Sequence, residues 1–451
     1  MSTSAQSTAP SHHDDMLNAV AQARLAYAAS RPRSAALHRR ACGSLPNGST
    51  RSTLSYGPFP TAMDRGEGCR LWDIDGHEYL DLCGEFTAGL FGHSETRIHA
   101  AIHEAMARGL NRGAVGEAEA ELAELLCARF PSCARVRFTN SGTEANLWAL
   151  TAARAFTGRD TVLVFRGGYH GSVLTFPAAG PSRVTVPFPF VIGEYNDIAG
   201  SVALIREHGA HLAAILVEPM LGAGGCIPAQ REFLEALRAA ATEVGALLIF
   251  DEVMTSRMSA GGLQARLGIT PDQTVLGKYI AGGMSFGGFG GREDVMNLFE
   301  SSVFHGGTFN NNVLSMTAGR VAMGEIFTAD AADALFDLGE GLRAELNAAC
   351  AGSGMQFTGV GSMMTVHFRA GSIDRPYLPT SREDALRELF FFDMLASHIY
   401  IVHRGMVTLS LPVTARDLRR FVEAVQEFAV ARRSLLALAS WQVERDSGKV
   451  A

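Results

Sequence analysis

The chain has 451 residues, of which 47% are hydrophobic and 19% are charged. A chain of this length and composition can bury a large core without disulfides or metal ions, and a largely disordered protein is excluded. The formal net charge of −7 argues against nucleic acid or an anionic membrane as a partner, since either needs a basic face. At about 150 residues per domain, we expect two or three domains.

The sequence predicts neither a membrane span nor a metal site. Residues 1–14 are polar and lack the apolar run of a signal peptide, so we expect a disordered leader there. No run reaches the roughly 18 apolar residues that a membrane span needs. Seven scattered cysteines without a CxxC pair argue against a zinc ribbon and are typical of a reduced compartment. We therefore expect a cytoplasmic protein.

Only two of the 39 basic residues are lysines, Lys278 and Lys449. Lys449 lies in the polar C-terminal tail, whereas Lys278 lies in the apolar, glycine-rich stretch LGKYIAGGMSFGGFGG. An arginine-biased composition alone does not explain a lysine in such surroundings. Because a desolvated lysine can lose its proton and act as an amine nucleophile, we favour a chemical role for Lys278.

Hydrophobic periodicity predicts the elements in chain order. A helix is expected over 15–29, and a hairpin over 70–82 around the turn Asp75-Gly76. Helices over 117–130 and 143–156 then alternate with short apolar runs. Strands this apolar between helices indicate a mainly parallel sheet that is buried on both faces. The strand candidates are 136–139, 161–165, 213–217, 246–250 and 274–276.

The pattern changes after about residue 329. A leucine-rich helix is followed by strand candidates at 363–368 and 406–411, and Thr414 and Asp417 have the spacing of a capping box before the last long helix. We predict an α/β protein: a large domain over 76–328, with a mainly parallel sheet between helices, and a smaller α+β domain. The smaller domain would combine 329–451 with an N-terminal segment, 15–75.

Polar residues follow the predicted strands at their carboxyl ends. Asp251 ends LLIFD, Glu218 follows AAILV, and Tyr169 lies in GGYHG after another apolar strand. A helix cap or an arginine partner would explain Asp251 about equally well, and a tight turn would explain Tyr169. Because ligands of open α/β sheets bind at this edge, the convergence is a stronger signal than any single residue.

The segment Ser141-Gly142-Thr143 connects a predicted strand to a predicted helix. An ordinary helix cap is one interpretation, and a phosphate cradle at the positive end of the helix is the other. Better-known phosphate motifs are missing, because Tyr279 follows Gly277-Lys278 and no GxGxxG opens a helix after a strand. The stretch 305–312, HGGTFNNN, is suited to a loop with many exposed donors.

Five motifs in this order, SGTEAN, GGYHG, VEP, FDEVMTSR and LGKYIAGGMSFGGFGGR, resemble the class III pyridoxal-phosphate aminotransferases. The resemblance covers residues from about 48 to 412. Within that family the chain is most similar to aromatic β-amino acid (β-phenylalanine) aminotransferases and next to glutamate-1-semialdehyde aminomutases. The resemblance implies the fold type I architecture, pyridoxal 5'-phosphate as cofactor, and a homodimer with shared active sites.

The resemblance also implies a role for each candidate residue. Lys278 would hold the cofactor covalently and shuttle the substrate proton, and Asp251 would keep its pyridine nitrogen protonated. Tyr169 would stack on the ring, and Glu218 would lie close by. Further cofactor contacts would come from Ser141, Gly142 and Thr143 at the phosphate, from Val253, and from Thr308, which would reach the phosphate of the neighbouring subunit.

Two arginines would select the substrates. By resemblance, Arg51 would bind the carboxylate of the β-amino acid and Arg404 the α-carboxylate of the keto acid. Solvated surface arginines are the ordinary alternative, although the apolar flanks of Arg404 make exposure less natural there. Phe86 stands in the side-chain pocket where the β-phenylalanine enzymes would have a tyrosine, so this pocket departs from the family pattern.

We therefore predict a transaminase that moves an amino group from a β-amino acid to 2-oxoglutarate or pyruvate. An aminomutase is the first alternative. The sequence Phe309-Asn310-Asn311-Asn312 speaks against it, because aminomutases usually carry a serine- and proline-containing segment there. A non-catalytic pyridoxal-phosphate-binding regulator is the second alternative, and the missing DNA-binding module and the acidic charge speak against it.

Overall fold

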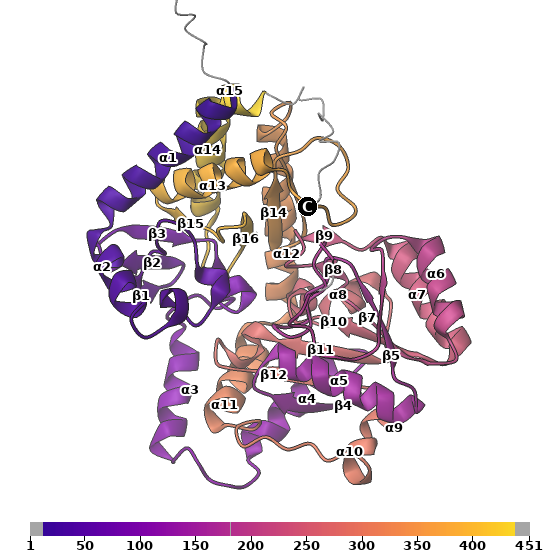
Figure 1. Ribbon diagram of the computed structural model, residues 1–451. Coiled ribbons are helices and arrows are strands. Elements are labelled where there is room, and N and C mark those ends of the chain that lie inside the picture. The colour runs from indigo at the N-terminus through magenta and orange to yellow at the C-terminus, as the bar shows by residue number, and fades with distance from the viewer. Residues whose placement is uncertain (1–11, 181, 438–451) are drawn as a thin grey trace, which may run out of the picture.

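A seven-stranded sheet forms the centre of the larger part of the molecule, in the order β4-β12-β11-β10-β7-β5-β6 (Figure 1). The computed structural model describes residues 12–180 and 182–437. All strands of this sheet run parallel except β12, which pairs antiparallel with β11 and β4. The strands are β4 (Arg135–Thr139), β5 (Thr161–Phe165), β6 (Phe190–Gly193), β7 (Leu212–Val217), β10 (Leu247–Asp251), β11 (Gln273–Gly277) and β12 (Gly287–Gly291).

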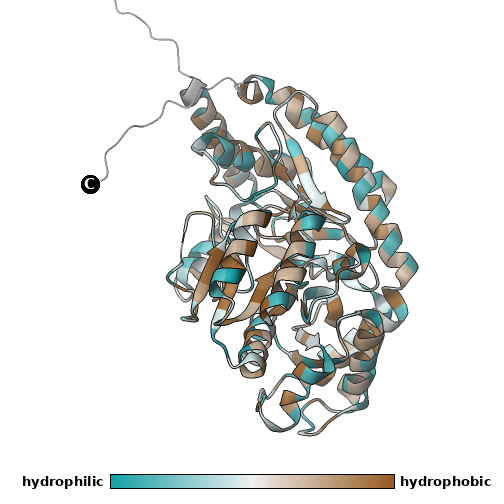
Figure 2. Ribbon diagram, turned by 90° about the vertical axis from the view of Figure 1, so that its right-hand side faces the viewer, coloured by the Kyte–Doolittle hydropathy of each residue, from teal (hydrophilic) through white to brown (hydrophobic). Residues whose placement is uncertain are grey.

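The central strands are buried on both faces because alternate side chains pack against different helices. From β7, Ile215 and Val217 belong to a cluster with α7 (Arg231–Val244), whereas Ala214 and Leu216 belong to a cluster with α5 (Gly142–Thr157). Figure 2 shows the brown strands of this sheet behind helices that alternate between brown and teal. The prediction of a mainly parallel sheet between helices is thus confirmed.

Two helices of this part were predicted, and both are observed close to the expected bounds. The expected helix 117–130 is α4 (Glu117–Arg129), and Gly158 ends α5 with a left-handed φ of 68°. A glycine is suited to this position because it has no Cβ to clash. The other helices are α3 (Thr96–Ala107), α6 (Ile198–His208), α8 (Gly262–Leu267), α9 (Glu293–Met296), α10 (Leu298–Ser301) and α11 (Val313–Val321), and β8 (Met220–Leu221) pairs with β9 (Ile227–Pro228).

The two ends of the described chain lie side by side in the smaller part of the molecule (Figure 1). Helix α1 (His12–Ser30) packs on α13 (Ser381–Ala396), and β15 (Ile399–Tyr400) pairs with β3 (Glu78–Asp81). Thr414 caps α14 (Ala415–Ala431) through the expected capping box. This part also contains α2 (Pro32–Ala41), β1 (Met63–Glu67), β2 (Arg70–Asp73), α12 (Ala329–Ala349), β13 (Gln356–Val360), β14 (Met363–His367), β16 (Met406–Thr408) and α15 (Arg433–Leu436).

Several expected boundaries differ from the observed ones. The expected hairpin is present as β2 and β3, and both strands belong to the sheet β1-β2-β3-β15. A domain boundary between 75 and 76 would therefore cut one sheet at its turn, and the division into two domains stays a prediction. Helix α1 begins at His12, inside the expected leader, whereas residues 1–11 and Lys449 lie outside the described residues. Within the described chain, no helix is long and apolar enough to cross a membrane.

Candidate active site

Neighbouring parallel strands bring the predicted residues to one edge of the sheet. Lys278 follows β11, Asp251 ends β10, Glu218 follows β7, and Tyr169 lies beyond the end of β5. These strands are adjacent in the order β11-β10-β7-β5 and parallel, so their carboxyl ends face the same side. The structure thus brings together side chains that are more than 100 positions apart in the chain.

Asp251 is buried, at 4% exposure, and its carboxylate accepts three hydrogen bonds. Asn146 Nδ2 and His170 Nδ1 both donate to Oδ2 at 2.8 Å, and the Val253 backbone N–H donates to Oδ1 at 3.0 Å. No arginine or lysine nitrogen of the described residues lies within 4 Å of this carboxylate. A cation that binds beside this buried carboxylate would therefore meet no competing arginine or lysine among the described residues.

Glu218 is also buried, and two backbone amides fix its carboxylate. The N–H of Tyr169 donates to Oε1 and the N–H of Gly222 to Oε2, both at 2.9 Å. Burial raises the pKa of Glu218 to about 7, while the nearby His170 opposes this shift. Glu218 thus anchors the backbone of Tyr169, whose side chain is 40% exposed at the edge of the site.

Lys278 begins a short helical turn directly after β11, with a left-handed φ of 58°. Burial lowers the pKa of its amine, and the positive charge of Arg51 lowers it further, whereas Asp251 and Glu85 raise it. A lowered pKa increases the fraction of neutral amine, the form that acts as a nucleophile. The left-handed backbone is unusual for a residue with a side chain, and such conformations cluster at functional sites.

The loop between β4 and α5 presents the amino end of a 16-residue helix to the site. Ser141 is the N-cap, since its Oγ accepts from the Glu144 N–H at 3.2 Å. The hydroxyl of Thr143 instead accepts from the Ser172 N–H at 3.3 Å. A Cβ at Gly171 would lie 2.3 Å from Thr143 Oγ1, so only glycine lets these two loops approach so closely.

Val253 lies between two glycines that only narrowly accommodate it. A Cβ at Gly142 would lie 3.0 Å from Val253 Cγ2, and a Cβ at Gly277 would lie 3.1 Å from Val253 Cγ1. The valine therefore packs between the start of α5 and the end of β11. It connects the phosphate-loop candidate, Ser141-Gly142-Thr143, to the segment that carries Lys278.

The segment after β3 forms a left-handed turn that carries Phe86 into the site. Gly84, Glu85, Phe86 and Thr87 have φ values of 51°, 47°, 54° and 82°. A left-handed conformation costs roughly 1–2 kcal/mol for each residue that has a Cβ. A run of this kind persists only where neighbouring groups hold it, so it indicates a functional constraint.

Groups on both sides hold this turn. Asp81 Oδ1 accepts from the backbone N–H of Cys83 at 2.9 Å and of Gly84 at 3.0 Å. At the other end, Arg257 donates from Nη1 to the Thr87 carbonyl at 3.4 Å and from Nε to Ser362 Oγ at 2.9 Å. Arg257 is fully buried, and burial lowers its pKa to about 10. This arginine belongs to the FDEVMTSR motif and holds the end of the turn at Thr87.

Arg51 and Arg404 approach the same ring from different elements. The guanidinium carbon of Arg51 lies 5.1 Å from the Phe86 ring centroid, and that of Arg404 lies 5.7 Å from it. Nη1 of Arg51 also forms an ion pair with Oε1 of Glu85. Arg404 is half-buried, and burial lowers its pKa. Among residues 12–180 and 182–437, no carboxylate lies within 4 Å of Arg404 and no hydrogen bond holds its guanidinium.

A cavity of about 330 Å³ opens beside Arg404 and Tyr169. Its walls are mostly apolar, and its polar groups include Thr365 and His367. The size and the mixture of apolar walls with a few polar groups are typical of small-molecule sites. The lining residues are Gly167, Gly168, Tyr169, Thr175, Pro177, Ala178, Ala223, Gly224, Gly225, Thr365, His367, Pro376, Tyr377, Pro379, Arg387 and Arg404.

Thr308 does not join the other predicted residues. It is exposed on the loop before α11 and lines a cavity of about 1520 Å³ together with Asn140, Ser285 and Phe309. Asn140 Nδ2 donates to Asn310 Oδ1 at 3.0 Å, so this loop contacts the residue that precedes Ser141. Several apolar side chains nearby are exposed, among them Phe309 at 59%.

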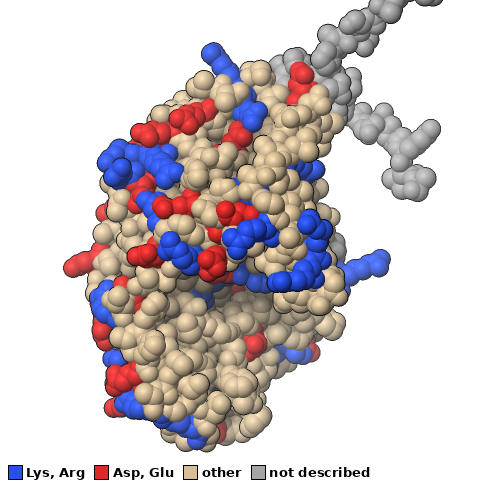
Figure 3. Space-filling view, turned by 90° about the vertical axis from the view of Figure 1, so that its left-hand side faces the viewer, with Lys and Arg blue, Asp and Glu red and all other residues tan. Residues whose placement is uncertain are grey.

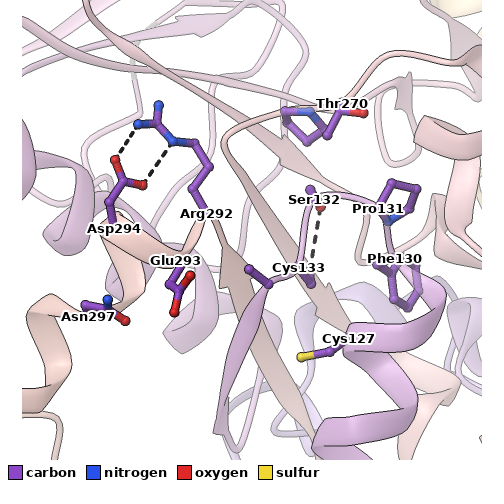
Figure 4. A pocket seen from close by; sticks show the side chains of 12 residues that line it. Cys127, Phe130, Pro131, Ser132, Cys133, Thr270, Arg292, Glu293, Asp294 and Asn297 are labelled. Atoms are coloured by element: carbon purple, nitrogen blue, oxygen red, sulfur yellow. Dashed lines mark hydrogen bonds and ion pairs between the residues drawn. The ribbon is translucent and has the colours of Figure 1, made fainter.

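Another cavity, of about 770 Å³, lies away from these residues (Figure 4). Its walls come from the segments before β4 and β11 and after β12, and Figure 4 shows Arg292 paired with Asp294 there. This is the amino edge of the parallel strands, opposite the edge that carries Asp251 and Lys278. The cavity therefore does not belong to the candidate site.

Sequence reasoning missed several residues of the site. His170 and Asn146 lie in the motifs GGYHG and SGTEAN, but nothing in the sequence links them to Asp251. Glu85 and Arg257 gave no local signal beyond charge. In each case the partner is far along the chain, so only the fold identifies the contact.

The chain matches known proteins over most of its length. The family model Aminotransferase class-III matches residues 52–386. A β-phenylalanine transaminase from Variovorax paradoxus is 52% identical over 401 residues, which cover 88% of this chain and 92% of that protein. A glutamate-1-semialdehyde 2,1-aminomutase from Rhodopirellula baltica is 37% identical over 379 residues, which cover 79% and 86%. The crystal structure of a β-phenylalanine aminotransferase from Variovorax paradoxus superposes with a TM-score of 0.92 at 50% identity, covering 93% of this chain and 99% of that one.

Proposed function

Because the chain belongs to the class III aminotransferases, which depend on pyridoxal 5'-phosphate, we propose that it transfers the amino group of an aromatic β-amino acid to 2-oxoglutarate or pyruvate. The observation that carries the choice of substrates is the pair of guanidinium groups, Arg51 and Arg404, on the single ring of Phe86. Two cations in one site suit an enzyme that binds two different carboxylic acids in turn.

The residues present fit the cofactor. The amine of Lys278, with its lowered pKa, would hold it covalently, and the buried Asp251 would face its cationic ring nitrogen. The amino end of α5, with Ser141, Gly142 and Thr143, offers free N–H groups to its phosphate. A side chain at Gly142 would crowd Val253, and one at Gly171 would collide with Thr143, so glycine at both positions keeps this loop packed. Tyr169 would cover the ring, and Val253 would pack beneath it.

Each of these residues has a distinct task in the reaction. The cofactor supplies a carbon that carries the amino group and a ring that accepts electrons. Nζ of Lys278 takes the proton from the substrate carbon that bears the amine. The negative charge of Asp251 would keep the ring nitrogen of the cofactor protonated. His170 and Asn146 hold this carboxylate in place. Glu218 fixes the backbone of Tyr169.

The two arginines would separate the substrates by the position of the carboxylate. A β-amino acid carries its carboxylate one carbon further from the reacting carbon than an α-keto acid does. Arg51 would bind the donor carboxylate and Arg404 the acceptor carboxylate, and the planar guanidinium suits both. Because Arg404 has no carboxylate partner among the described residues, its charge is available to a ligand.

The cavity beside Arg404 suits an aromatic donor side chain. Tyr169, Pro376 and Tyr377 supply much of its apolar wall, and its volume is about 330 Å³. We propose that the ring of the donor occupies this cavity while its carboxylate binds Arg51. Phe86, whose ring both guanidinium groups approach, would then form one wall of the substrate site.

A second copy of this chain would complete the site. Figure 3 shows the side of the molecule where α3 lies, with charged side chains above and a broad area of few charges below. Exposed apolar residues near the Thr308 loop include Val115 at 90% and Phe309 at 59%. Such a surface is typical of an interface between proteins. We propose a homodimer in which Thr308 reaches the partner's cofactor phosphate.

The aminomutase remains the second candidate function, and its relative is the less similar of the two at 37% identity against 52%. The free Arg404 favours the transaminase, because an aminomutase needs no separate acceptor. We also propose a cytoplasmic location, which the seven free cysteines of the described chain support.

A panel of amine donors with 2-oxoglutarate, read by glutamate formation, tests the proposed function. We expect aromatic β-amino acids to give glutamate with 2-oxoglutarate. With pyruvate as the acceptor, the same donors should give alanine. Isomerisation of glutamate 1-semialdehyde without any keto acid would favour the aminomutase instead. Absence of turnover with every β-amino acid, but turnover with α-amino acids, would contradict the assigned donor.

A further inference from the structure

Arg51 reaches the proposed substrate site already paired. Its Nη1 forms an ion pair with Oε1 of Glu85, whereas no carboxylate of the described residues pairs with Arg404 on the same ring. Arg51 thus has a carboxylate partner within the protein and Arg404 has none among the described residues, although each is proposed to bind a substrate carboxylate. Glu85 has no part in the roles described so far.

The fold holds Glu85 beside Arg51. Glu85 lies within the left-handed turn Gly84–Thr87, at φ 47°, and this turn is anchored by Asp81 at its start and by Arg257 at its end. A non-glycine residue keeps this conformation only where the surroundings impose it. The position of the Glu85 backbone is therefore built into the site.

The ion pair is open to exchange. The side chain of Arg51 is 44% exposed and that of Glu85 is 54% exposed. Exposed ion pairs contribute little free energy, so another carboxylate can replace Glu85 at small cost. The replacement would leave Arg51 paired in both states, once with Glu85 and once with the ligand.

The exchange at Arg51 matters because the donor and the acceptor bind in turn. A monocarboxylic acceptor such as pyruvate has one carboxylate, and Arg404 would bind it. Without Glu85, the guanidinium of Arg51 would then have no carboxylate partner among the described residues. The charge of the pair also reaches Lys278, because Arg51 lowers the pKa of its amine and Glu85 raises it.

Building on the proposed function, we propose that Glu85 determines specificity by occupying Arg51 whenever no substrate carboxylate does. Each ligand that binds Arg51 displaces Glu85, so Glu85 weakens the binding of such ligands. Ligands that use only Arg404 are unaffected. Arg51 thus keeps a carboxylate partner in both halves of the cycle, Glu85 in one and the ligand in the other.

The test compares holoenzyme variants with a carboxylate that has no amine, 3-phenylpropanoate, and with its neutral amide, 3-phenylpropanamide. Calorimetry should show about twofold to fivefold tighter binding of the carboxylate to Glu85→Gln, as expected for an exposed ion pair, and no change for the amide. Glu67→Gln is the matched control, because Glu67 pairs with Arg65 at 3.7 Å on the surface and should change neither ligand.

The Arg51→Ala background separates this role from a structural one. There, adding Glu85→Gln should give no further tightening. Equal or weaker carboxylate binding by Glu85→Gln, or the same tightening without Arg51, would overturn the proposal. Glu85→Ala gives the same comparison should the glutamine variant fail to fold, as checked by circular dichroism.

Failure of the proposed function would look different. If no β-amino acid yields glutamate but Glu85→Gln still binds 3-phenylpropanoate more tightly through Arg51, the donor assignment is wrong and the role of Glu85 stands. If β-amino acids react but the Glu85→Gln variant binds 3-phenylpropanoate no better, the donor assignment stands and the role of Glu85 is wrong.

Discussion

His170 donates from Nδ1 to Oδ2 of Asp251 at 2.8 Å, at the carboxyl edge of the central sheet. The same oxygen accepts from Asn146, so two neutral or cationic donors fix one carboxylate oxygen. This arrangement fixes the orientation of the Asp251 carboxylate. It also makes the carboxylate hard to replace by an amide. Both oxygens accept hydrogen bonds, so the amide NH2 group would face another N–H donor at either position.

We expect Asp251→Asn to lose about two orders of magnitude in kcat, or roughly 3 kcal/mol, because an amide cannot hold the ring proton by charge. Steady-state rates together with cofactor content check this prediction. Asp272→Asn is a control for a buried aspartate away from the site, since Asp272 pairs with Arg238 at 2.7 Å. Wild-type turnover by Asp251→Asn with cofactor bound would refute the role.

Lys278→Ala should abolish covalent attachment of the cofactor and nearly all turnover, because the variant loses both the nucleophile and the proton carrier. Borohydride reduction followed by peptide mapping should place the label on Lys278 in the wild type. Lys449→Ala, which changes the other lysine of the chain, should keep full activity. Label on Lys449 would show that the lysine was assigned wrongly.

Arg51→Ala and Arg404→Ala should impair opposite half-reactions. Arg51→Ala should slow the reaction with the β-amino acid, and Arg404→Ala the reaction with the keto acid. Each loss should be about 2–4 kcal/mol, as for a charge pair that loses one partner. Stopped-flow absorbance of the two separate half-reactions measures this. Equal damage to both halves by either substitution would indicate one shared carboxylate site.

Glu218 should make stability depend on pH. Its pKa is raised to about 7 in the folded protein, whereas an ordinary glutamate has about 4.5. Between these values the folded state keeps a proton that the unfolded chain has lost, so the free energy of unfolding falls as the pH rises through this window. The loss should be on the order of 3 kcal/mol.

Urea unfolding at pH 5 and 7.5, after removal of the cofactor, measures this effect. Glu218→Gln should remove most of the fall that the wild type shows. Glu243→Gln is the control, because Arg206 lowers the pKa of the exposed Glu243 and its titration is complete below this window. The same pH dependence in wild type and Glu218→Gln would refute the raised pKa as the cause.

Gly171→Ala should weaken cofactor binding more than it weakens the fold. A Cβ at Gly171 would lie 2.3 Å from Thr143 Oγ1 and would push the phosphate-loop candidate away. Gly341→Ala is the control, since its Cβ would meet nothing within 4 Å in α12 and should stabilise the helix by about 0.5–1 kcal/mol. Cofactor titration of both variants, with thermal unfolding alongside, distinguishes the two effects.

The glycine-rich strand β12 shows where local pattern fails. The segment Gly287–Gly291 lacks the apolar run that marks a buried strand, so hydrophobic periodicity does not predict it. The fold requires glycine there, because a Cβ at Gly287 would lie 2.1 Å from the Ser141 carbonyl oxygen. Close approach of two backbones leaves no trace in hydrophobic periodicity.

By itself the sequence determined the layout of the sheet edge that carries the candidate site. Apolar runs identify the strands, and parallel strands share one direction, so residues after β5, β7, β10 and β11 had to meet at one edge. The motifs around Lys278 and Asp251 identified the family, which the comparisons confirmed.

Only the tertiary structure decided which side chains touch. His170 lies 81 positions from Asp251, Asn146 lies 105 positions from it, and Glu85 lies 34 positions from Arg51. Such contacts depend on strand register, loop conformation and rotamers, and the left-handed turn at Glu85 has no local sequence signal. Periodicity reports which face of an element is buried, whereas the partner of a polar group depends on where distant elements finally pack.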